Sequence, residues 1–367
     1  MGESDFVKRL LAWYRRERRD LPWRRNRDPY RVWIAETMLQ QTTVKAVVPY
    51  FDRFVRRFPD IASLAAARES DVLALWSGLG YYARARNLHR AAKVLAEDHA
   101  GRLPDDPVVV SNLPGFGPYT TGAVLSIAFD RKVPLVDGNV ARVLSRVRLV
   151  RGDPRSKEVR NRLWGVAGDL VRLADSASDF NQAMMELGAL VCAPRRPACL
   201  LCPVSSDCAA RRRGLEESLP ERAPRARSRA VYGAAVVARR KRGEFLLARR
   251  SDDEKVMPGL YELPGVLFWE GKAAPKPEAL ESEIESRLGV TIDVRDEIGS
   301  VAHTITTRRL TTVVFAGTVE GAVPRGGRLR WATLRGTEKL PLSSLTKKIL
   351  GKILDSAGTP APARARR

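Results

Sequence analysis

Hydrophobic residues recur at every third or fourth position through the first 210 residues of the chain. Stretches such as FVKRLLAWY, VLALWSGL and NLHRAAKVLAE therefore place their apolar side chains on one face of a helix. Clusters of Pro and Gly interrupt this period, among them DLPWRRNRDP, NLPGFGP and RGDP, and they predict where helices end. The pattern predicts an all-helical domain over residues 1–210.

The hydrophobic period changes after residue 230. The segments AVYGAAVVARR, EFLLARR, TIDVRDEIGSV and LTTVVFAGTV are short, alternating and rich in β-branched residues, which is typical of strands. PEALESEIESRLG predicts a helix between strands. We therefore expect an α+β domain over residues 231–355. Residues 211–230 have almost no apolar content and predict a linker, and residues 356–367 predict a disordered tail.

The chain carries a formal net charge of +22, and the basic excess is spread along its length. Residues 1–210 hold 33 basic and 23 acidic side chains, and residues 231–367 hold 24 and 16. This charge suits a polyanionic partner such as nucleic acid or an anionic membrane, although an Arg-rich solvated surface would look the same. The first twenty residues are charged and no long apolar run follows, so we expect a soluble, cytoplasmic protein.

All four cysteines of the chain lie in one short stretch, CAPRRPACLLCPVSSDC. Cys192, Cys199, Cys202 and Cys208 follow the spacing C-x6-C-x2-C-x5-C. In an intracellular protein, clustered thiols indicate metal or redox chemistry rather than disulfides. Four thiolates can bind tetrahedral zinc or a [4Fe–4S] cluster. The wide gaps favour the cluster, because its iron atoms are separate corners.

The stretch LPGFGPYTTGAVLSIA, residues 113–128, predicts a helix-hairpin-helix. Gly115 and Gly117 allow a positive φ and the close approach of another backbone. The helix that follows begins with free N–H groups, which can bind a DNA phosphate without reading bases. Helical hairpins also contain Gly for packing alone, so the turn by itself is a weak indication.

Two carboxylates stand out from their surroundings. Glu36 lies in the otherwise apolar VWIAETMLQQT, where a buried acid tends to be protonated. Asp137 opens a helix in VPLVDGNVARVLSR, where a capping role would also explain it, and Glu36 could be an exposed helical charge. If both acids face one cleft, one can act as a general acid and the other can stabilise a sugar cation. That chemistry cleaves an N-glycosidic bond.

The motifs taken together resemble a known family. DPYRVWIAETMLQQT, LWSGLGYYARARNLH, LPGFGPYTTGA, VDGNVARVLSR, FNQAMMELGALVC and the cysteine loop are closely similar to the MutY adenine DNA glycosylases, of the helix-hairpin-helix/endonuclease III superfamily. The resemblance covers nearly all of residues 5–210, and more weakly extends to a C-terminal Nudix-like domain. It implies a monomeric base excision repair enzyme that removes adenine paired with 8-oxoguanine or guanine in duplex DNA.

The resemblance also implies a role for individual residues. Glu36 falls at the general acid that protonates adenine at N7. Asp137, supported by Asn139, falls at the aspartate that stabilises the sugar cation. Tyr119 replaces the Schiff-base lysine of endonuclease III, which implies a monofunctional glycosylase.

Further positions match the DNA contacts and the cofactor of the family. Gln41 and Tyr81 match side chains that wedge into the duplex. The wall of the adenine pocket is matched by Trp23, Arg24, Leu39 and Gln182. The four cysteines match the ligands of a [4Fe–4S] cluster.

The C-terminal half departs from its relatives at two places. GLYELPG resembles the opening of a Nudix fold, but the following helix lacks the R-E-x2-E-E-x-G pattern, so we expect no pyrophosphatase activity. In AHTITTRRL, Ile305, Thr306 and Thr307 stand where the family recognises 8-oxoguanine with Phe-Ser-His. Thr306 keeps a hydroxyl group that could bond the lesion. A plain edge strand of alternating Thr is the alternative.

Three other functions compete with an adenine glycosylase. An endonuclease III-like lyase would need an active-site lysine. A non-catalytic DNA-binding module would not need two catalytic acids. A Nudix hydrolase would release pyrophosphate in a Mg²⁺-dependent reaction.

Overall fold

The computed structural model describes residues 2–224, 229–240, 243–305, 307–323 and 327–353. The chain divides into two compact units. The first contains residues 1–66 and 87–224, and the second contains residues 67–86 and 225–367. Among the helices that the structure describes, none combines the length and apolar character that a bilayer crossing requires.

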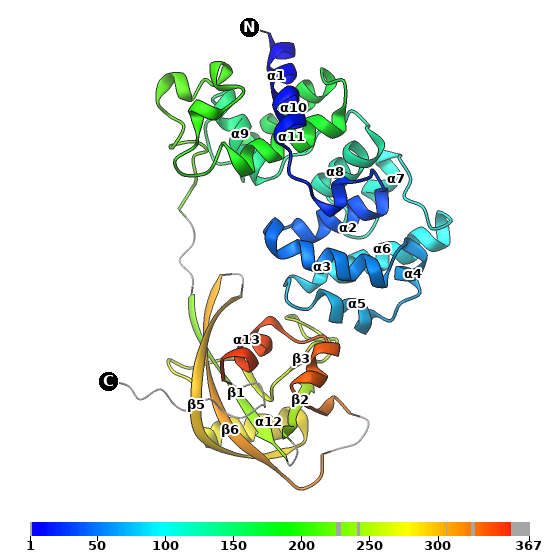
Figure 1. The fold of residues 1–367 in the computed structure, drawn as a ribbon. Helices are drawn as coiled ribbons and strands as arrows, with labels where there is room; N and C mark the ends of the chain where they lie inside the picture. Colours follow the sequence, from blue (N-terminus) through cyan, green and yellow to red (C-terminus); the bar gives the residue numbers. More distant parts are fainter. Residues whose placement is uncertain (1, 225–228, 241–242, 306, 324–326, 354–367) are drawn as a thin grey trace. The chain divides into compact units, whose positions relative to one another are not determined.

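The first unit is helical, as the hydrophobic period predicts (Figure 1). Its α-helices are α1 (Glu3–Glu17), α2 (Pro29–Leu39), α3 (Val44–Arg57), α4 (Ile61–Ala65), α6 (Tyr82–Asp98, mostly in this unit), α7 (Pro107–Ser111), α8 (Pro118–Phe129), α9 (Gly138–Val147), α10 (Lys157–Arg172) and α11 (Ala177–Leu190). Its 3-10 turns are η1 (Pro22–Arg24), η2 (Cys199–Leu201), η3 (Ser205–Asp207) and η4 (Arg211–Arg213).

One hydrophobic core joins the ends of the first unit. Leu10 of α1, Leu144 of α9 and Leu187 of α11 belong to it and are almost fully buried. α1 thus packs beside helices more than a hundred positions away in the sequence. This core holds the N-terminal ends of α8 and α9 in fixed positions.

Residues 211–230 are expected to be a linker, but the first part of this segment is folded into the first unit. Residues 211–224 belong to the first unit, and Leu219 is only 3% exposed within its core. The N–H groups of Gly152 and Ala223 donate to the side chains of Glu221 and Asp153. Residues 225–228 lie outside the described part of the chain, as does the expected tail at 356–367.

The second unit is built on one mixed sheet (Figure 1). Its strands are β1 (Arg229–Arg239), β2 (Phe245–Arg249), β3 (Tyr261–Glu262), β4 (Gly265–Trp269), β5 (Thr291–Ile305), β6 (Arg308–Glu320) and β7 (Leu329–Ala332). Their order is β3-β2-β1-β6-β5, with β4 also paired to β1 and β7 to β2. β1 and β6 run parallel, and the other pairs are antiparallel.

A helix covers each face of this sheet. Val237 and its neighbours on one face pack against α13 (Ser344–Ile353), and Val236 and its neighbours on the other pack against α12 (Pro277–Leu288). Because both faces are covered, β1 is buried on successive positions rather than on alternate ones. The helical domain and the α+β domain predicted from the sequence are thus both confirmed.

A short segment from the first half of the chain belongs to the second unit. Residues 67–86 carry α5 (Glu69–Trp76) and the loop that follows it. The hydroxyl groups of Ser77 and Tyr82 both donate to the carbonyl oxygen of Leu342, at 2.9 and 2.6 Å. Nothing in the local pattern of the sequence indicates this membership.

Candidate active site and cysteine cavity

Glu36 is a carboxylic acid enclosed by apolar side chains. It lies on α2, which starts at the N-cap residue Asp28. Every residue from Val32 to Met38 is buried, and Glu36 itself is only 4% exposed. Burial raises the pKa of Glu36 to about 7, so a substantial fraction of the carboxyl groups is protonated at neutral pH. The burial expected from the sequence is therefore confirmed.

Tyr119 is the hydrogen-bonding partner of Glu36. It lies in the first turn of α8, and its hydroxyl group donates to Oε2 of Glu36 at 2.5 Å. Burial and the neighbouring carboxylate raise the pKa of Tyr119 well above its ordinary value, so the phenol remains a donor. The bond favours the ionised carboxylate, and it lowers the pKa of Glu36 against the effect of burial.

Asp137 is the N-cap residue of α9, and both of its carboxylate oxygens are fixed by hydrogen bonds. Oδ1 accepts from the Val140 N–H at 2.7 Å, and Oδ2 accepts from Nδ2 of Asn139 at 2.9 Å. Burial raises the pKa of Asp137, and these two bonds oppose the rise by favouring the anion. The capping role considered for Asp137 is confirmed, but it leaves the side chain beside a cavity.

A cavity of about 450 Å³ brings these groups together. Its size is within the range of small-molecule sites, roughly 300–1,000 Å³. The sequence-predicted residues that line it are Trp23, Arg24, Glu36, Leu39, Tyr119, Asp137, Asn139 and Gln182. They come from η1, α2, α8, α9 and α11, so the fold assembles one site from separate parts of the sequence.

Glu186 is a second buried acid on this wall, and the sequence reasoning missed it. Its side chain is 1% exposed and accepts paired hydrogen bonds from Arg19 and from Arg24, at 2.7–3.1 Å. Burial alone would raise the pKa of Glu186, but the two guanidinium groups outweigh it and hold the value at about 2. The sequence did contain a signal for Glu186: it is a lone acid in the largely apolar FNQAMMELGALVC, just as Glu36 is in its own helix.

The glycine hairpin lies between α7 and α8. Gly115 has a φ of +82°, and a Cβ atom there would lie 2.7 Å from the Cβ of Asn87. Gly117 has a φ of −91°, with no atom within 4 Å of a Cβ placed on it. Only Gly115 uses the conformational freedom that the sequence offered at both positions.

Two predicted DNA contacts, Gln41 and Tyr81, are not part of the cavity lining, and a third lies outside the described residues. Gln41 is exposed, with a φ of +60°, just beyond α2. Tyr81 is 58% exposed, with a φ of +48°, on a loop of the second unit. Thr306 lies outside the described residues, between Ile305 and Arg308, which pair at the ends of β5 and the neighbouring β6.

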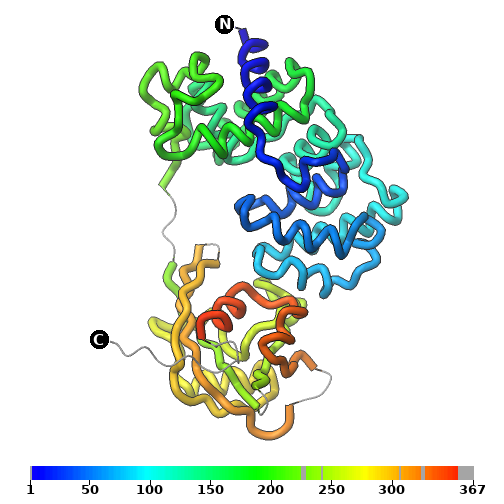
Figure 2. The backbone as a smooth tube through the Cα atoms, in the orientation of Figure 1, coloured from blue at the N-terminus to red at the C-terminus, as the bar shows by residue number. Residues whose placement is uncertain are grey.

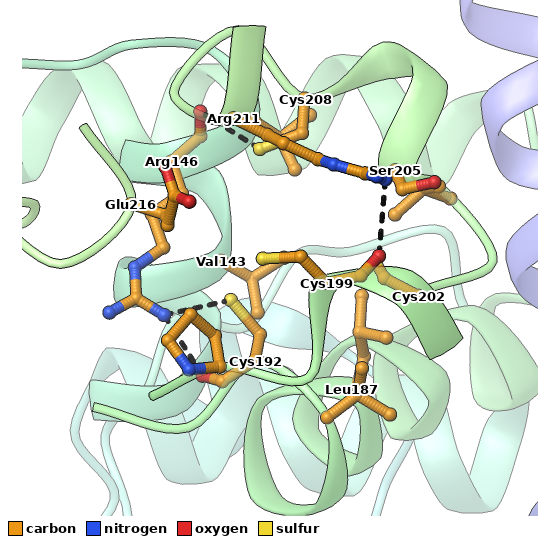
Figure 3. A pocket seen from close by; sticks show the side chains of 14 residues that line it. Val143, Arg146, Leu187, Cys192, Cys199, Cys202, Ser205, Cys208, Arg211 and Glu216 are labelled. Atoms are coloured by element: carbon orange, nitrogen blue, oxygen red, sulfur yellow. Dashed lines mark hydrogen bonds between the residues drawn. The ribbon is translucent and has the colours of Figure 1, made fainter. Parts of the chain in front are cut away.

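The four cysteines line a second cavity in the first unit (Figure 3). Figure 2 follows the chain through this loop in green, after the end of α11. All four thiols are free, and Val143, Val147 and Leu187 line the same space. In the described part of the chain, no group of three or more His, Cys, Asp or Glu side chains is placed to hold a metal ion. The four thiols that line this space are nevertheless the donor set of an iron–sulfur cluster, in which each thiolate binds a separate iron atom.

Comparisons with known proteins match both domains of the chain. Residues 34–168 match the HhH-GPD superfamily of base excision DNA repair proteins, and residues 234–352 match the NUDIX domain. The adenine DNA glycosylase of Rattus norvegicus is 35% identical over 398 residues, covering 94% of this chain and 77% of its own length. The human adenine DNA glycosylase is 36% identical, covering 93% and 72%. The structure of a thermostable thymine-DNA glycosylase is 32% identical, with a TM-score of 0.52 over 57% of this chain and 97% of its own.

Proposed function

The chain belongs to the adenine DNA glycosylases, and from that premise we propose that it hydrolyses the N-glycosidic bond of adenine paired with 8-oxoguanine or guanine. The observation that supports this most strongly is one cavity that holds Glu36, at a pKa of about 7, together with Asp137. Glycoside cleavage requires one acid that titrates near neutrality and a second whose anionic form is stabilised, here by the hydrogen bonds from Val140 and Asn139.

The cavity receives the adenine only after the base leaves the duplex. A stacked base is out of reach of side chains, so the nucleotide must rotate out at a cost of a few kcal/mol. We propose that the flipped adenine binds between Trp23 and Leu39, with Gln182 and Arg24 available to its polar edge. Glu186 keeps Arg24 oriented, because its carboxylate accepts two bonds from that guanidinium group.

Glu36 then supplies the proton that makes adenine a leaving group. Its carboxyl proton passes to N7 of the base, and the bond between N9 and C1′ breaks with its electron pair going to the adenine. Water adds to C1′ and releases one proton, which reprotonates the Glu36 carboxylate directly or through solvent. The net reaction is DNA and water to an abasic site and free adenine. Tyr119 stabilises the Glu36 carboxylate formed by the transfer, through its hydrogen bond to Oε2.

Asp137 stabilises the positive charge that develops on the sugar. Its two oxygens are held by the Val140 N–H and by Asn139, so the carboxylate does not need to reorganise during the reaction.

We also propose that the enzyme is monofunctional. Tyr119 cannot form a Schiff base, and its hydroxyl is engaged with Glu36. Lys45 lines the outer part of the cavity and is exposed there, so it is the residue to test for lyase chemistry.

The remaining predicted contacts act on the duplex in this proposal. Gln41 and Tyr81, both exposed at positive φ, would fill the gap left by the flipped base. The hairpin at Gly115 and Gly117 would bind a backbone phosphate. Thr306 would donate a hydrogen bond to 8-oxoguanine. We propose that the chain acts as a monomer.

For the cysteine cavity we propose a [4Fe–4S] cluster, held by Cys192, Cys199, Cys202 and Cys208. The cluster would order the loop and could exchange an electron, and none of the steps above requires it. Purified protein should contain about four iron and four acid-labile sulfide per chain. One zinc per chain without sulfide would contradict this assignment.

One experiment tests the proposed reaction as a whole. The protein is incubated with a duplex carrying adenine opposite 8-oxoguanine, with and without borohydride. We expect free adenine and a strand that breaks only after alkali, with no covalent adduct. A strand break without alkali, or a borohydride adduct lost in Lys45→Met, would show a lyase instead.

A further inference from the structure

Arg146 is a buried cation whose hydrogen bonds all end on the cysteine loop or on the segment after it. It lies on α9 and is 1% exposed. Its guanidinium group donates to Sγ of Cys192 at 3.2 Å, as Figure 3 shows, and to the carbonyl oxygen of the same residue at 3.4 Å. It also donates to the carbonyl oxygens of Ala193 at 2.7 Å, Pro194 at 3.0 Å and Leu219 at 2.9 Å.

These bonds join the two ends of one loop. The acceptors Cys192, Ala193 and Pro194 start the loop, and Leu219 follows its last cysteine by eleven positions. Leu219 is 3% exposed, so this carbonyl group is buried with the guanidinium group. The same helix begins at Asp137, and Arg146 thereby fastens the loop to the helix that carries this acid.

Among the described residues no carboxylate forms an ion pair or hydrogen bond with Arg146, although Glu216 lines the same cavity. The acceptors of its guanidinium group are four carbonyl oxygens and one sulfur atom. A buried cation is unfavourable unless a negative charge lies close to it. Thiolates that ligate a cluster would supply that charge, at the distance the structure shows for Sγ of Cys192.

We propose that Arg146 is the counter-charge of the iron–sulfur cluster and closes the cysteine loop around it. Arg146 is in this view a positioning residue, because it acts through Cys192 and not on the DNA. The proposal rests on the cluster assigned above, but not on the adenine reaction.

Two measurable properties follow from this placement. Hydrogen bonds to ligand sulfur and nearby positive charge stabilise the more negative, reduced form of a cluster, so Arg146 raises its reduction potential. The clasp also slows the loss of iron, because the loop cannot open without breaking the five hydrogen bonds of the Arg146 guanidinium group. A merely structural residue would leave the potential unchanged.

Arg211 provides the matched control. It lines the same cavity, but it donates to the carbonyl oxygen of Cys199 at 3.2 Å and not to a sulfur atom. It is also less buried than Arg146. Loss of a cationic side chain near the cluster is therefore common to both variants, whereas the bond to sulfur is specific to one.

The experiment compares holoprotein of the wild type with Arg146→Met, Arg146→Lys and Arg211→Met. We measure the reduction potential of the cluster and the rate at which an excess of chelator removes iron. Arg146→Met should lower the potential and release iron at least about tenfold faster. Arg146→Lys keeps the charge and should fall between Arg146→Met and the wild type. Arg211→Met removes a cation without a bond to sulfur, so it should lower the potential by less than Arg146→Met. If Arg146→Met does not fold, the potential and the iron release rate can still be measured on Arg146→Lys.

The proposal is overturned if Arg146→Met and Arg146→Lys have the potential and the iron release rate of the wild type, or if Arg211→Met changes both as much. Wild-type protein without iron and sulfide would overturn the cluster assignment and this inference together. Loaded wild-type protein that releases no adenine would contradict the proposed reaction and leave the role of Arg146 standing.

Discussion

Two glutamates on the wall of one cavity differ in pKa because their neighbours differ. Glu36 is surrounded by apolar residues and a phenol, and its pKa is raised to about 7. Glu186 faces Arg19 and Arg24, and its pKa is held at about 2. At neutral pH the first can donate a proton and the second can only accept hydrogen bonds. This separation of pKa values supports Glu36 as the proposed general acid.

Glu36→Gln should lower the single-turnover rate of adenine release at least about a hundredfold, because glutamine has no proton to give. Glu17→Gln, at an exposed position of α1, is the matched control and should leave the rate unchanged. A Glu36→Gln protein as fast as the wild type would remove the assignment.

Glu36→Gln should also stabilise the fold at alkaline pH. The pKa of Glu36 is higher in the folded protein, so the folded state binds its proton more tightly, and stability falls as pH rises from about 4.5 to about 7. Above pH 7, Glu36→Gln should therefore raise the free energy of unfolding by up to roughly 3 kcal/mol. Urea unfolding at acid and alkaline pH measures this difference, which should vanish below pH 4.5.

Tyr119→Phe should shift the pH profile of adenine release toward higher pH. The phenol lowers the pKa of Glu36 by bonding its ionised form, so its loss lets burial raise that pKa further. The alkaline limb of single-turnover rate against pH reports the change. Tyr30→Phe is the control, since the Tyr30 hydroxyl bonds the Phe58 carbonyl group instead. A shift toward lower pH would contradict the account.

At the scale of elements, the two functions of Asp137 can be separated. Asparagine can cap α9 as well as aspartate, but it carries no charge. Asp137→Asn keeps the cap but loses the acceptor for Asn139, so it should cost less stability than Asp137→Ala while lowering the release rate at least about a hundredfold. Asp137→Ala should lose the rate and also about 1 kcal/mol of stability, measured by urea unfolding. Equal activity of Asp137→Asn and wild type would show that the cap is its whole role.

Two glycines in the hairpin before α8 allow a comparable test of whether the backbone geometry matters at one position and not at the other. Gly115→Ala meets a positive φ and a contact of 2.7 Å with Asn87, so it should destabilise the protein by about 1–3 kcal/mol and weaken binding to duplex DNA. Gly117→Ala meets neither, and should cost at most about 1 kcal/mol. Thermal unfolding and DNA titration distinguish them. Equal effects of both substitutions would contradict a specific geometry at Gly115.

The sequence predicts the elements better than it predicts their surroundings. Hydrophobic periods of three to four and of two residues predicted the helical and α+β domains, and both are present. Leu219 was assigned to a linker because it is nearly alone among charged residues, yet a single apolar side chain suffices to pack when Arg146 bonds its carbonyl group. Composition averaged over twenty positions cannot show such a contact.

The pKa values of the site residues and their hydrogen-bonding partners likewise could not be predicted from the sequence. Burial of Glu36 follows from its apolar neighbours in α2, but the bond to Tyr119 joins positions 83 residues apart. Glu186 and its two arginines are separated by more than 160 residues. Only the folded core, which sets α2, α8 and α11 against one cavity, determines these pairs.

For the whole molecule, the basic excess in both halves of the sequence is consistent with contact to DNA along much of the chain. The side chains proposed to be catalytic line a cavity in the first unit, whereas Tyr81 and position 306 belong to the second. We therefore expect recognition of the lesion and excision of the adenine to depend on different residues, which separate variants can address.

The measurement that tests this account most directly is single-turnover adenine release from duplexes that differ only in the base opposite adenine: 8-oxoguanine, guanine or thymine. Wild type should be fastest opposite 8-oxoguanine, slower opposite guanine and inactive opposite thymine. Thr306→Ala should slow release opposite 8-oxoguanine and leave the rate opposite guanine unchanged. Release at one rate from all three duplexes, or from none, would contradict an adenine glycosylase specific for mispaired bases.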